Sequence, residues 1–228
     1  MYKILFFFFP IVILSQNNFE KGQILFNQKK YSEANTYFEN HLKTNPEDYK
    51  AIEYLGDIAG YYKKWDEAIE KYKLLKEKFS TNANYHYKYG GAMGMKAKES
   101  SKFKALGMID EIEESFKTAA KLDPKHTDTR WALLILYLEL PGILGGSEKK
   151  SQKYADELMT ISTIDGIMAK GHIEEYFKRY TTAEKFYIKG VNLTHSKTAY
   201  QRLINLYQKM KLPQKVKATQ LESEKYNK

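Results

Sequence analysis

The sequence predicts an all-α protein, a right-handed α-solenoid of about six antiparallel helix pairs. Three observations lead to this class. A glycine recurs every 34 residues, at Gly22, Gly56 and Gly90. An alanine follows two of these glycines after twelve residues, at Ala34 and Ala68, and an aromatic residue follows each alanine after four. A fixed period of this length is typical of stacked helical repeats, in which each repeat packs only against its neighbours.

The N-terminal residues differ in composition from the rest. Lys3 is the only charge before an unbroken apolar run over residues 4–14. A cation, a short apolar stretch and a small residue, Ser15, form the pattern of a secretory signal peptide, whereas a membrane-spanning helix needs about 20 apolar residues. We therefore expect residues 1–15 to be a signal peptide, the mature chain to begin near Gln16, and no membrane span to remain after cleavage. An uncleaved N-terminal anchor is the alternative.

The charged residues limit the class of partner. The formal net charge is +9, and the basic residues are almost all lysine, with arginine only at Arg130, Arg179 and Arg202. Lysine is a solvated point charge rather than a bidentate reader of phosphate, so we expect a protein or peptide partner and no nucleic acid. The sequence contains no cysteine, so packing between repeats must stabilise an exported chain. We expect a periplasmic or extracellular location.

The first two repeats, about 17–48 and 49–82, follow the period closely. Apolar residues at helical spacing predict one helix through each glycine and a second through each alanine. Ser32 and Asp66 stand between the two helices of their pairs, and we expect them to be helix N-caps. Because glycine and alanine lack bulk where the helices cross, the nearby aromatic residues are expected to fill the remaining space.

The third and fourth repeats are less regular, whereas the fifth returns to the pattern, with Ala183 twelve residues after Gly171 and Tyr187 four residues later. The third has ten extra residues within 95–108, which either lengthen both helices or form an excursion of their own. The fourth contains a glycine-rich segment, 141–147. The polar end of the last repeat is expected to cap the stack, as terminal repeats must. The four repeats occupy about residues 83–125, 126–162, 163–196 and 197–226.

The repeated segments resemble the tetratricopeptide repeat (TPR). The matching stretches are Tyr54–Asp57 with Trp65–Tyr72, and Phe116–Pro124. The resemblance extends over nearly all of residues 17–226, within a predicted solenoid over 16–228. It implies a TPR-like superhelix, here of an exported bacterial type, that binds a protein or peptide as a non-catalytic scaffold.

The resemblance also implies where a partner binds, because in this family the first helix of each pair lines a concave groove. Glu53 and Asp57 stand where a lysine–asparagine clamp for C-terminal carboxylates would need other residues, so no such clamp is expected. The middle of the groove is acidic and aromatic, which favours a basic or aromatic-bearing peptide. The groove would comprise Phe19, Gln23, Phe26, Glu53, Asp57, Tyr61, Asn84, Tyr87, Asp128, Trp131, Ile135, His172, Glu175, Gln201 and Asn205.

Catalytic and metal chemistry find no support in the motifs. The segment 141–147 lacks the lysine before Ser/Thr that a phosphate-binding loop needs, so we expect a turn with Gly145 or Gly146 at positive φ and Ser147 as N-cap. The five histidines form no paired i, i+4 motif, and we expect no metal, cofactor or catalytic residue.

Two alternatives to a groove-binding scaffold stay open. The first is a structural or assembly subunit of a cell-envelope complex that uses its loops and convex face. The second is an enzyme acting on envelope polymers, for which the sequence shows no nucleophile–base pair and no carboxylate pair.

Overall fold

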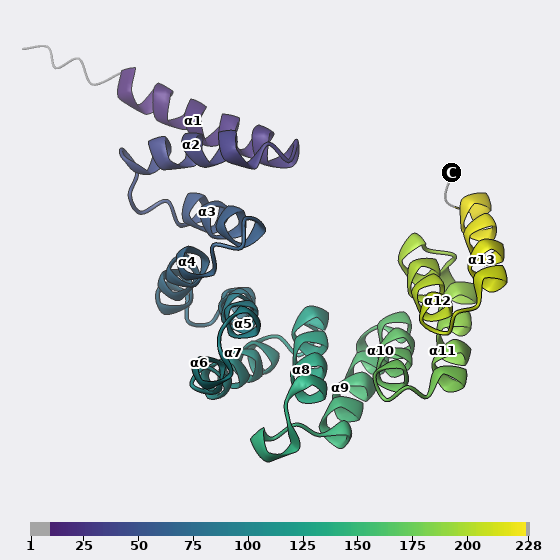
Figure 1. Ribbon diagram of the computed structural model, residues 1–228. Coiled ribbons are helices and arrows are strands. Elements are labelled where there is room, and N and C mark those ends of the chain that lie inside the picture. The colour runs from purple at the N-terminus through teal and green to yellow at the C-terminus, as the bar shows by residue number, and fades with distance from the viewer. Residues whose placement is uncertain (1–9, 227–228) are drawn as a thin grey trace, which may run out of the picture. The chain divides into compact units, whose positions relative to one another are not determined.

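The protein is helical throughout the part that the structure describes. A computed structural model describes the backbone of residues 10–226 and the side chains of residues 18–226. Within residues 10–226 there are thirteen α-helices, one short 3-10 helix and no β-strand (Figure 1). Helices that follow each other in the sequence pack against each other within two compact units. The predicted all-α solenoid of helix pairs is therefore confirmed.

The first unit ends at Leu122 and holds three helix pairs. The ten extra residues of the third repeat do two things, since α5 has 17 residues where α3 has 13, and α6 is a short excursion packed on α5. The helices of this unit are α1 (Pro10–Asn27), α2 (Tyr31–Leu42), α3 (Tyr49–Tyr61), α4 (Trp65–Lys78), α5 (Ala83–Glu99), α6 (Lys102–Leu106) and α7 (Ile109–Leu122).

The second unit begins at Asp123 and also holds three pairs. A single residue, Ser162, connects α9 to α10 and serves as the N-cap of α10. The elements are α8 (Thr127–Glu139), the 3-10 helix η1 (Gly142–Leu144), α9 (Glu148–Ile161), α10 (Thr163–Tyr176), α11 (Tyr180–Thr194), α12 (Lys197–Lys209) and α13 (Pro213–Tyr226).

The predicted signal peptide, residues 1–15, lies mostly outside the described residues. The backbone of α1 begins at Pro10, inside that segment. Across the part of the chain that the structure describes, no helix combines the length and the hydrophobicity needed to cross a membrane. Export and cleavage stay predictions.

The 34-residue period corresponds to a repeated contact between the helices of a pair. A Cβ atom placed on Gly22 would come within 2.8 Å of the ring of Phe38. This separation is shorter than a van der Waals contact, so only glycine allows the ring to lie directly on the first helix. The predicted role of the glycine and aromatic residues is confirmed. The same contact recurs between Gly56 and Tyr72, Gly90 and Phe116, and Gly171 and Tyr187.

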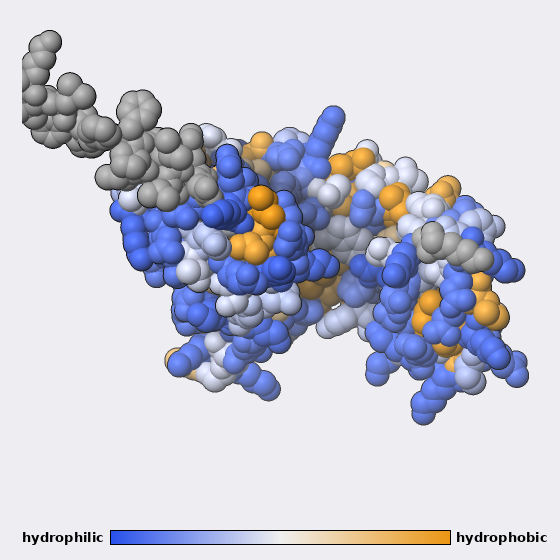
Figure 2. Space-filling view, turned by 90° about the horizontal axis from the view of Figure 1, so that it is seen from above, coloured by the Kyte–Doolittle hydropathy of each residue, from blue (hydrophilic) through white to orange (hydrophobic). Residues whose placement is uncertain are grey.

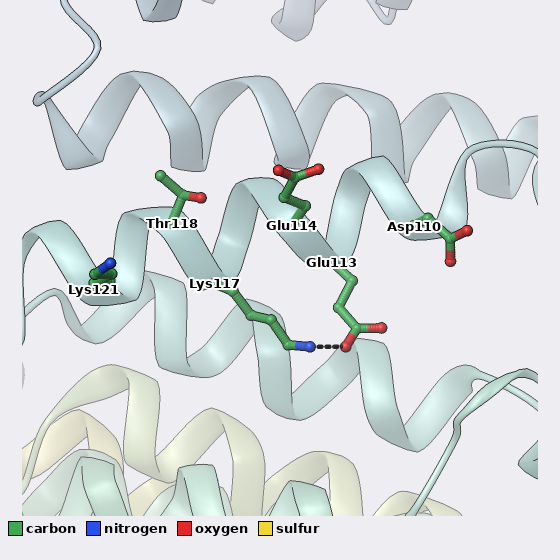
Figure 3. A pocket seen from close by; sticks show the side chains of 6 residues that line it. All are labelled: Asp110, Glu113, Glu114, Lys117, Thr118 and Lys121. Carbon is green, nitrogen blue, oxygen red and sulfur yellow. Dashed lines mark ion pairs between the residues drawn. The ribbon is translucent and has the colours of Figure 1, made fainter.

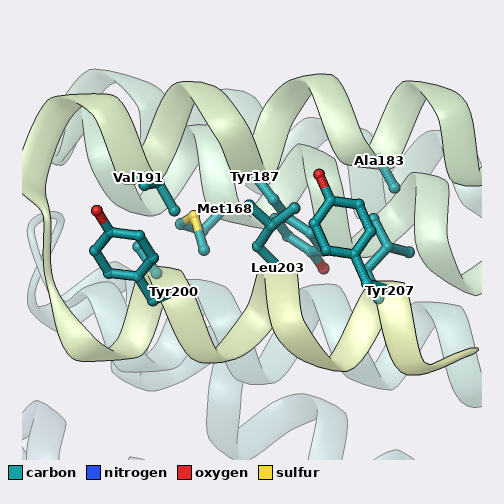
Figure 4. Packing of buried hydrophobic residues seen from close by; sticks show 9 residues of the cluster. Met168, Ala183, Tyr187, Val191, Tyr200, Leu203 and Tyr207 are labelled. Atoms are coloured by element: carbon teal, nitrogen blue, oxygen red, sulfur yellow. The ribbon is translucent and has the colours of Figure 1, made fainter. Parts of the chain in front are cut away.

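Each unit buries its own apolar core. In the second unit, Tyr187 and Tyr200 are fully buried, and Figure 4 shows the cluster that they form between α11 and α12. In the first unit, Phe38 is fully buried against Leu55 and Ile58. Burial of such side chains contributes about 1.5–3 kcal/mol each, so these clusters hold neighbouring repeats together.

The turns inside the first two repeats differ from the sequence prediction. The N-cap positions of α2 and α4 are Lys30 and Lys64, neither of which makes a side-chain capping bond. Ser32 and Asp66, predicted as N-caps, are instead the second residues of their helices. The reason is the lysine before each N-cap, Lys29 or Lys63, whose φ is near +60° and which turns the chain into the helix early.

The glycine-rich segment of the fourth repeat follows the prediction. Gly145 has a φ of 90° and closes η1. The side chain of Ser147 accepts a hydrogen bond from the backbone N–H of Lys150 and caps α9. The segment is therefore a turn between two helices.

The left-handed conformation of Lys63 leads to a testable expectation. Replacing Lys63 with glycine removes the clash between Cβ and the backbone at its φ of 58°, so K63G is expected to raise the free energy of unfolding by about 0.5–1 kcal/mol. The matched variant K73G, in the middle of α4, should lower it by about 1 kcal/mol. Urea denaturation measures both. A loss of stability in K63G would contradict the assignment of strain to this turn.

Candidate partner-binding face

All fifteen predicted groove residues lie on the first helices of their pairs. These helices are α1, α3 and α5 in the first unit and α8, α10 and α12 in the second. We call the side-chain surface of these helices in each unit its first-helix face. Several of the fifteen residues serve packing between helices and others are exposed, so their placement is described residue by residue.

The residues of α1 pack on a tyrosine of α3. The rings of Phe19 and Phe26 lie 6.1 and 4.9 Å from the ring of Tyr54, measured between centroids. The side-chain amide of Gln23 donates a hydrogen bond of 3.1 Å to the hydroxyl of the same tyrosine. These three side chains join the first repeat to the second.

The acidic residues of α3 are neutralised within the protein. The ammonium group of Lys88, on α5, lies 2.7 Å from a carboxylate oxygen of Glu53 and 2.6 Å from one of Asp57. Lys50 adds a second pair to Glu53 at 2.8 Å. The acidic patch that the sequence suggests on this face is therefore an ion-pair network between two repeats, and it does not offer free carboxylates to a basic peptide.

Burial and charge shift two pKa values in this network. Burial alone would raise the pKa of the Glu53 carboxyl, but hydrogen bonds from Lys50 and Lys88 outweigh burial and hold it below its ordinary value. The hydroxyl of Tyr72 donates a hydrogen bond of 2.6 Å to Asp57. Burial first, and the charge of Asp57 second, raise the pKa of Tyr72, so it stays a donor at neutral pH.

The remaining residues of the first unit are varied. Tyr61 is 63% exposed at the end of α3, and its ring lies 4.2 Å from that of Tyr31. Asn84 is half-buried in the first turn of α5, where its backbone N–H donates to the side chain of the N-cap Asn82. Tyr87 is half-buried, with its ring 6.2 Å from that of Phe116.

The second unit brings aromatic and cationic side chains together. The indole N–H of Trp131 donates a hydrogen bond of 3.0 Å to Asp165, and the guanidinium of Arg202 lies 5.0 Å from the indole centroid. The ring of His172 lies 6.3 Å from that of Trp131. Burial, and then the charge of Arg202, lower the pKa of His172, so its imidazole is neutral at neutral pH. Three first helices thus contribute to one cluster.

Glu175 is held in the same way as Asp57 in the first unit. The hydroxyl of Tyr187 donates to it at 2.6 Å, and Lys209 of the next repeat pairs with it at 2.5 Å. Tyr72 and Tyr187 occupy equivalent positions, four residues after the alanine of their second helices. A buried tyrosine, a carboxylate of the first helix and a lysine of the next repeat therefore form the same device in both units.

A hollow lies between α10 and α12. It has a volume of about 510 Å³ and is lined by six side chains. Arg202 and Lys209 contribute two positive charges, Glu175 contributes one negative charge, and His172 is neutral, so the hollow carries one net positive charge. The lining residues are His172, Glu175, Arg202, Asn205, Gln208 and Lys209.

The last predicted residues flank this hollow or lie apart from it. Asn205 lines it and is exposed, and its side-chain oxygen accepts a hydrogen bond of 2.8 Å from Gln201, which is also exposed. Asp128 is exposed in the first turn of α8, and Ile135 is half-buried on the same helix.

Two other hollows are shallow depressions along single helices. Figure 3 shows one that is lined by six residues of α7, in which Lys117 pairs with Glu113 across one helical turn. Another is lined by residues of α9 alone. Among the described residues, no three His, Asp or Glu side chains come close enough to hold a metal ion.

The ion pairs make the stability depend on pH. The pKa values of Glu53 and Glu175 are lower in the folded chain than in the unfolded one, so their contribution is complete above the unfolded pKa and is lost as the pH falls through the folded pKa. Solvent screens the exposed Lys50 and Lys209, which limits each contribution to about 1 kcal/mol. Between about pH 6 and pH 3 the wild type should therefore lose about 2–4 °C more in Tm than E53Q. If thermal scans showed the same fall in Tm for the wild type and E53Q, the ionised Glu53 would contribute no pH-dependent stability.

Comparison with solved structures identifies the class of fold. No protein-family model matches the sequence, and no curated protein sequence matches it. Among solved structures, a thermophilic TPR protein of Thermus thermophilus (TTC0263) is similar with a TM-score of 0.69 and 18% identity, over 84% of this chain and 98% of that one. A tetratricopeptide repeat protein of Parabacteroides merdae is similar with a TM-score of 0.63 and 14% identity, over 90% and 77%.

Human IFIT1, solved as a dimer with m7Gppp-AAAA, is similar with a TM-score of 0.66 and 16% identity; the match spans 92% of this chain and 54% of that one. At these identities the likeness concerns the fold. The protein has the fold of the tetratricopeptide-repeat class. It is a TPR-like repeat protein, as the resemblance of the sequence implied.

Sequence reasoning missed the residues that complete the face. Lys88 follows Asp57 by 31 residues and Lys209 follows Glu175 by 34, so opposite charges about one period apart were the available signal. For Arg202, the only signal in the sequence is that it is one of three arginines. Arg130 and Arg179 both pair with carboxylates, whereas Arg202, in the part of the chain that the structure describes, pairs with none.

Proposed function

We propose that this protein is a non-catalytic scaffold that holds a segment of a partner protein against its first-helix faces. The observation that carries the proposal is Arg202. Its guanidinium lies on the ring of Trp131 and lines a hollow of net positive charge, without a carboxylate partner among the described residues. Within the protein the guanidinium contacts the ring of Trp131 and the hydroxyl of Tyr187, so it keeps donors with which a carboxylate can form charge-assisted hydrogen bonds.

The same chemistry defines the partner. A side-chain or terminal carboxylate entering the hollow would accept hydrogen bonds from Arg202, with the side-chain amide of Asn205 beside it. Trp131 and His172 provide aromatic surface next to the charge, and tryptophan and arginine are typical anchors of protein interfaces. We therefore propose an acidic segment in place of the basic peptide that the sequence suggests, because Glu53, Asp57 and Glu175 are already paired with lysines.

The location of this binding is proposed as well. The apolar run over residues 4–14 behind Lys3 favours export and a periplasmic or extracellular site of action. The alternative function is an assembly subunit of an envelope complex that uses its loops and convex face. In that case no segment of a partner binds in the hollow.

The test compares three forms of the exported chain as bait in envelope extract. We expect the wild type and K197Q, which neutralises an exposed lysine on the same helix, to retain a partner that R202Q loses by roughly tenfold or more. A photo-crosslinking residue at position 205 should join the partner covalently. Circular dichroism checks that R202Q stays helical. A partner retained by R202Q would move the interface away from the hollow, and a recovered chain that begins at Met1 would overturn cleavage of the signal peptide.

A further inference from the structure

The turns within the helix pairs of the first unit carry an unusual set of side chains. These turns are residues 28–30, 62–64 and 100–108, between the first and second helix of each pair. They contain six lysines and no acidic residue. The turns between pairs, residues 43–48 and 79–82, contain one lysine and two acidic residues. Positive charge is therefore concentrated at one end of the helices.

The three turns form one continuous edge. Tyr31 and Tyr61 bring the first turn against the second, with ring centroids 4.2 Å apart. The indole N–H of Trp65 donates to Glu99 at 2.8 Å, which joins the second turn to the third. Lys96 pairs with Asp66 at the same junction. We call residues 28–31, 61–65 and 99–108 the basic edge.

Five of the six lysines in these turns form no ion pair inside the described part of the protein. Lys64 pairs with Glu67 at 3.2 Å. The other five lysines of the turns pair with no carboxylate in the part of the chain that the structure describes, and all five are exposed. They are Lys29, Lys30, Lys63, Lys102 and Lys104.

Large apolar side chains stand between these lysines. Phe103 is 87% exposed on the one-turn helix α6, directly between Lys102 and Lys104. Tyr61 and Tyr62 are 63% and 47% exposed, and their rings meet edge to face at 5.2 Å. The face seen in Figure 2 is largely hydrophilic, with hydrophobic residues in separate small patches. An aromatic ring so fully in water is not part of the core.

We propose that the basic edge binds the surface of a membrane rich in anionic lipids, with Phe103 inserted among the headgroups and the tyrosines at the level of the interface. Each lysine near such a surface contributes electrostatic attraction, and aromatic side chains favour the boundary between headgroups and acyl chains. Apart from Tyr61 and Glu99, which end α3 and α5, this proposal rests on residues outside the first-helix faces. It does not depend on the hollow of the second unit, on which the proposed scaffold function rests.

The composition of the edge favours a membrane over a protein. Lysine is depleted in protein interfaces, where arginine is enriched, and the unpaired cations here are all lysine. A solvated point charge suits a diffuse layer of headgroups better than a fixed bidentate site. Phe103 projects outward between two such charges, the arrangement that lets a ring enter the interface while the ammonium groups stay in water.

The test is sedimentation of the full chain with vesicles of phosphatidylcholine alone or mixed with phosphatidylglycerol. The N-terminal apolar run is common to every variant, so differences between variants cannot come from it. We expect binding to the anionic vesicles that weakens in about 0.5 M salt, and at least roughly tenfold weaker binding when Lys102→Glu and Lys104→Glu are combined. The matched control combines Lys73→Glu and Lys121→Glu, two exposed lysines of the same unit, and should bind as the wild type does.

A spectroscopic arm tests insertion itself. The fluorescence of Phe103→Trp should shift to shorter wavelength on anionic vesicles, while Leu74→Trp, 44% exposed on α4, should not shift. Equal binding by the two charge-reversed variants, or equal binding to neutral and anionic vesicles, would overturn the proposal. Binding of RNA or of an acidic protein by a chain that does not bind vesicles would also overturn the proposal. If R202Q lost the protein partner of the hollow but still bound anionic vesicles, partner binding and membrane binding would be shown to use different sites.

Discussion

Replacing Gly166 with alanine is expected to lower the free energy of unfolding by about 2–3 kcal/mol. The reason is the one-residue connection at Ser162, which presses the first turn of α10 onto the last turn of α9. A Cβ atom on Gly166 would lie 2.4 Å from the Cα atom of Met159. Because the obstacle is backbone, no side-chain rotation relieves the clash, and the two helices must move apart.

The matched variant is G91A, in the middle of α5. A Cβ atom there meets nothing within 4 Å, so the better helix propensity of alanine should raise stability by about 0.5–1 kcal/mol. Urea denaturation of the two variants beside the wild type measures both effects. If G166A were as stable as the wild type, the close crossing of α9 and α10 would be wrong.

Truncating Tyr187 to alanine is expected to cost about 3–5 kcal/mol. Its side chain is fully buried at the centre of the second unit's core (Figure 4). Its ring lies directly on Gly171. The cavity left by alanine cannot fill, because Gly171 has no side chain to enter it.

The control for this prediction is Y187F, which keeps the ring and removes only the hydroxyl, with its hydrogen bond of 2.6 Å to Glu175 and its contact with Arg202. It should cost about 1 kcal/mol, since Lys209 still pairs with the carboxylate. Thermal and urea unfolding of both variants separate packing from hydrogen bonding. Equal losses in Y187A and Y187F would instead assign most of the energy to the hydroxyl.

The helix pairs could be predicted because their signal lies within single repeats. Gly22 and Phe38 are 16 residues apart in a segment with uniform helical spacing, so periodicity alone predicts that they meet. The N-caps of α2 and α4 could not be predicted in this way. The turn is set by a lysine in the left-handed conformation. Glycine or asparagine at that position would have indicated the conformation, but Lys29 and Lys63 do not.

The electrostatics of the candidate face depend on contacts between repeats. The sequence suggests that Glu53 and Asp57 form a free acidic patch, but Lys88 on the next first helix pairs with both and Lys50 supplies the second positive charge. Whether Lys88 reaches them depends on the register of α5 against α3, which no local pattern determines. The division into two compact units after Leu122 is likewise a property of packing between repeats, and the 34-residue period does not mark it.

The tyrosine–carboxylate–lysine device also bears on how such a chain can grow. In both instances the lysine comes from the first helix of the following repeat. The two partners of each ionic bond therefore lie in different repeats, and a repeat that is duplicated or exchanged must supply a lysine at the right position for its neighbour. A second copy of residues 49–82 placed after the first would put Tyr54 at the position of Lys88, so whole repeats of this chain are not interchangeable. The ten-residue insertion of the third repeat lies beyond Lys88, where it leaves the bond to Asp57 intact.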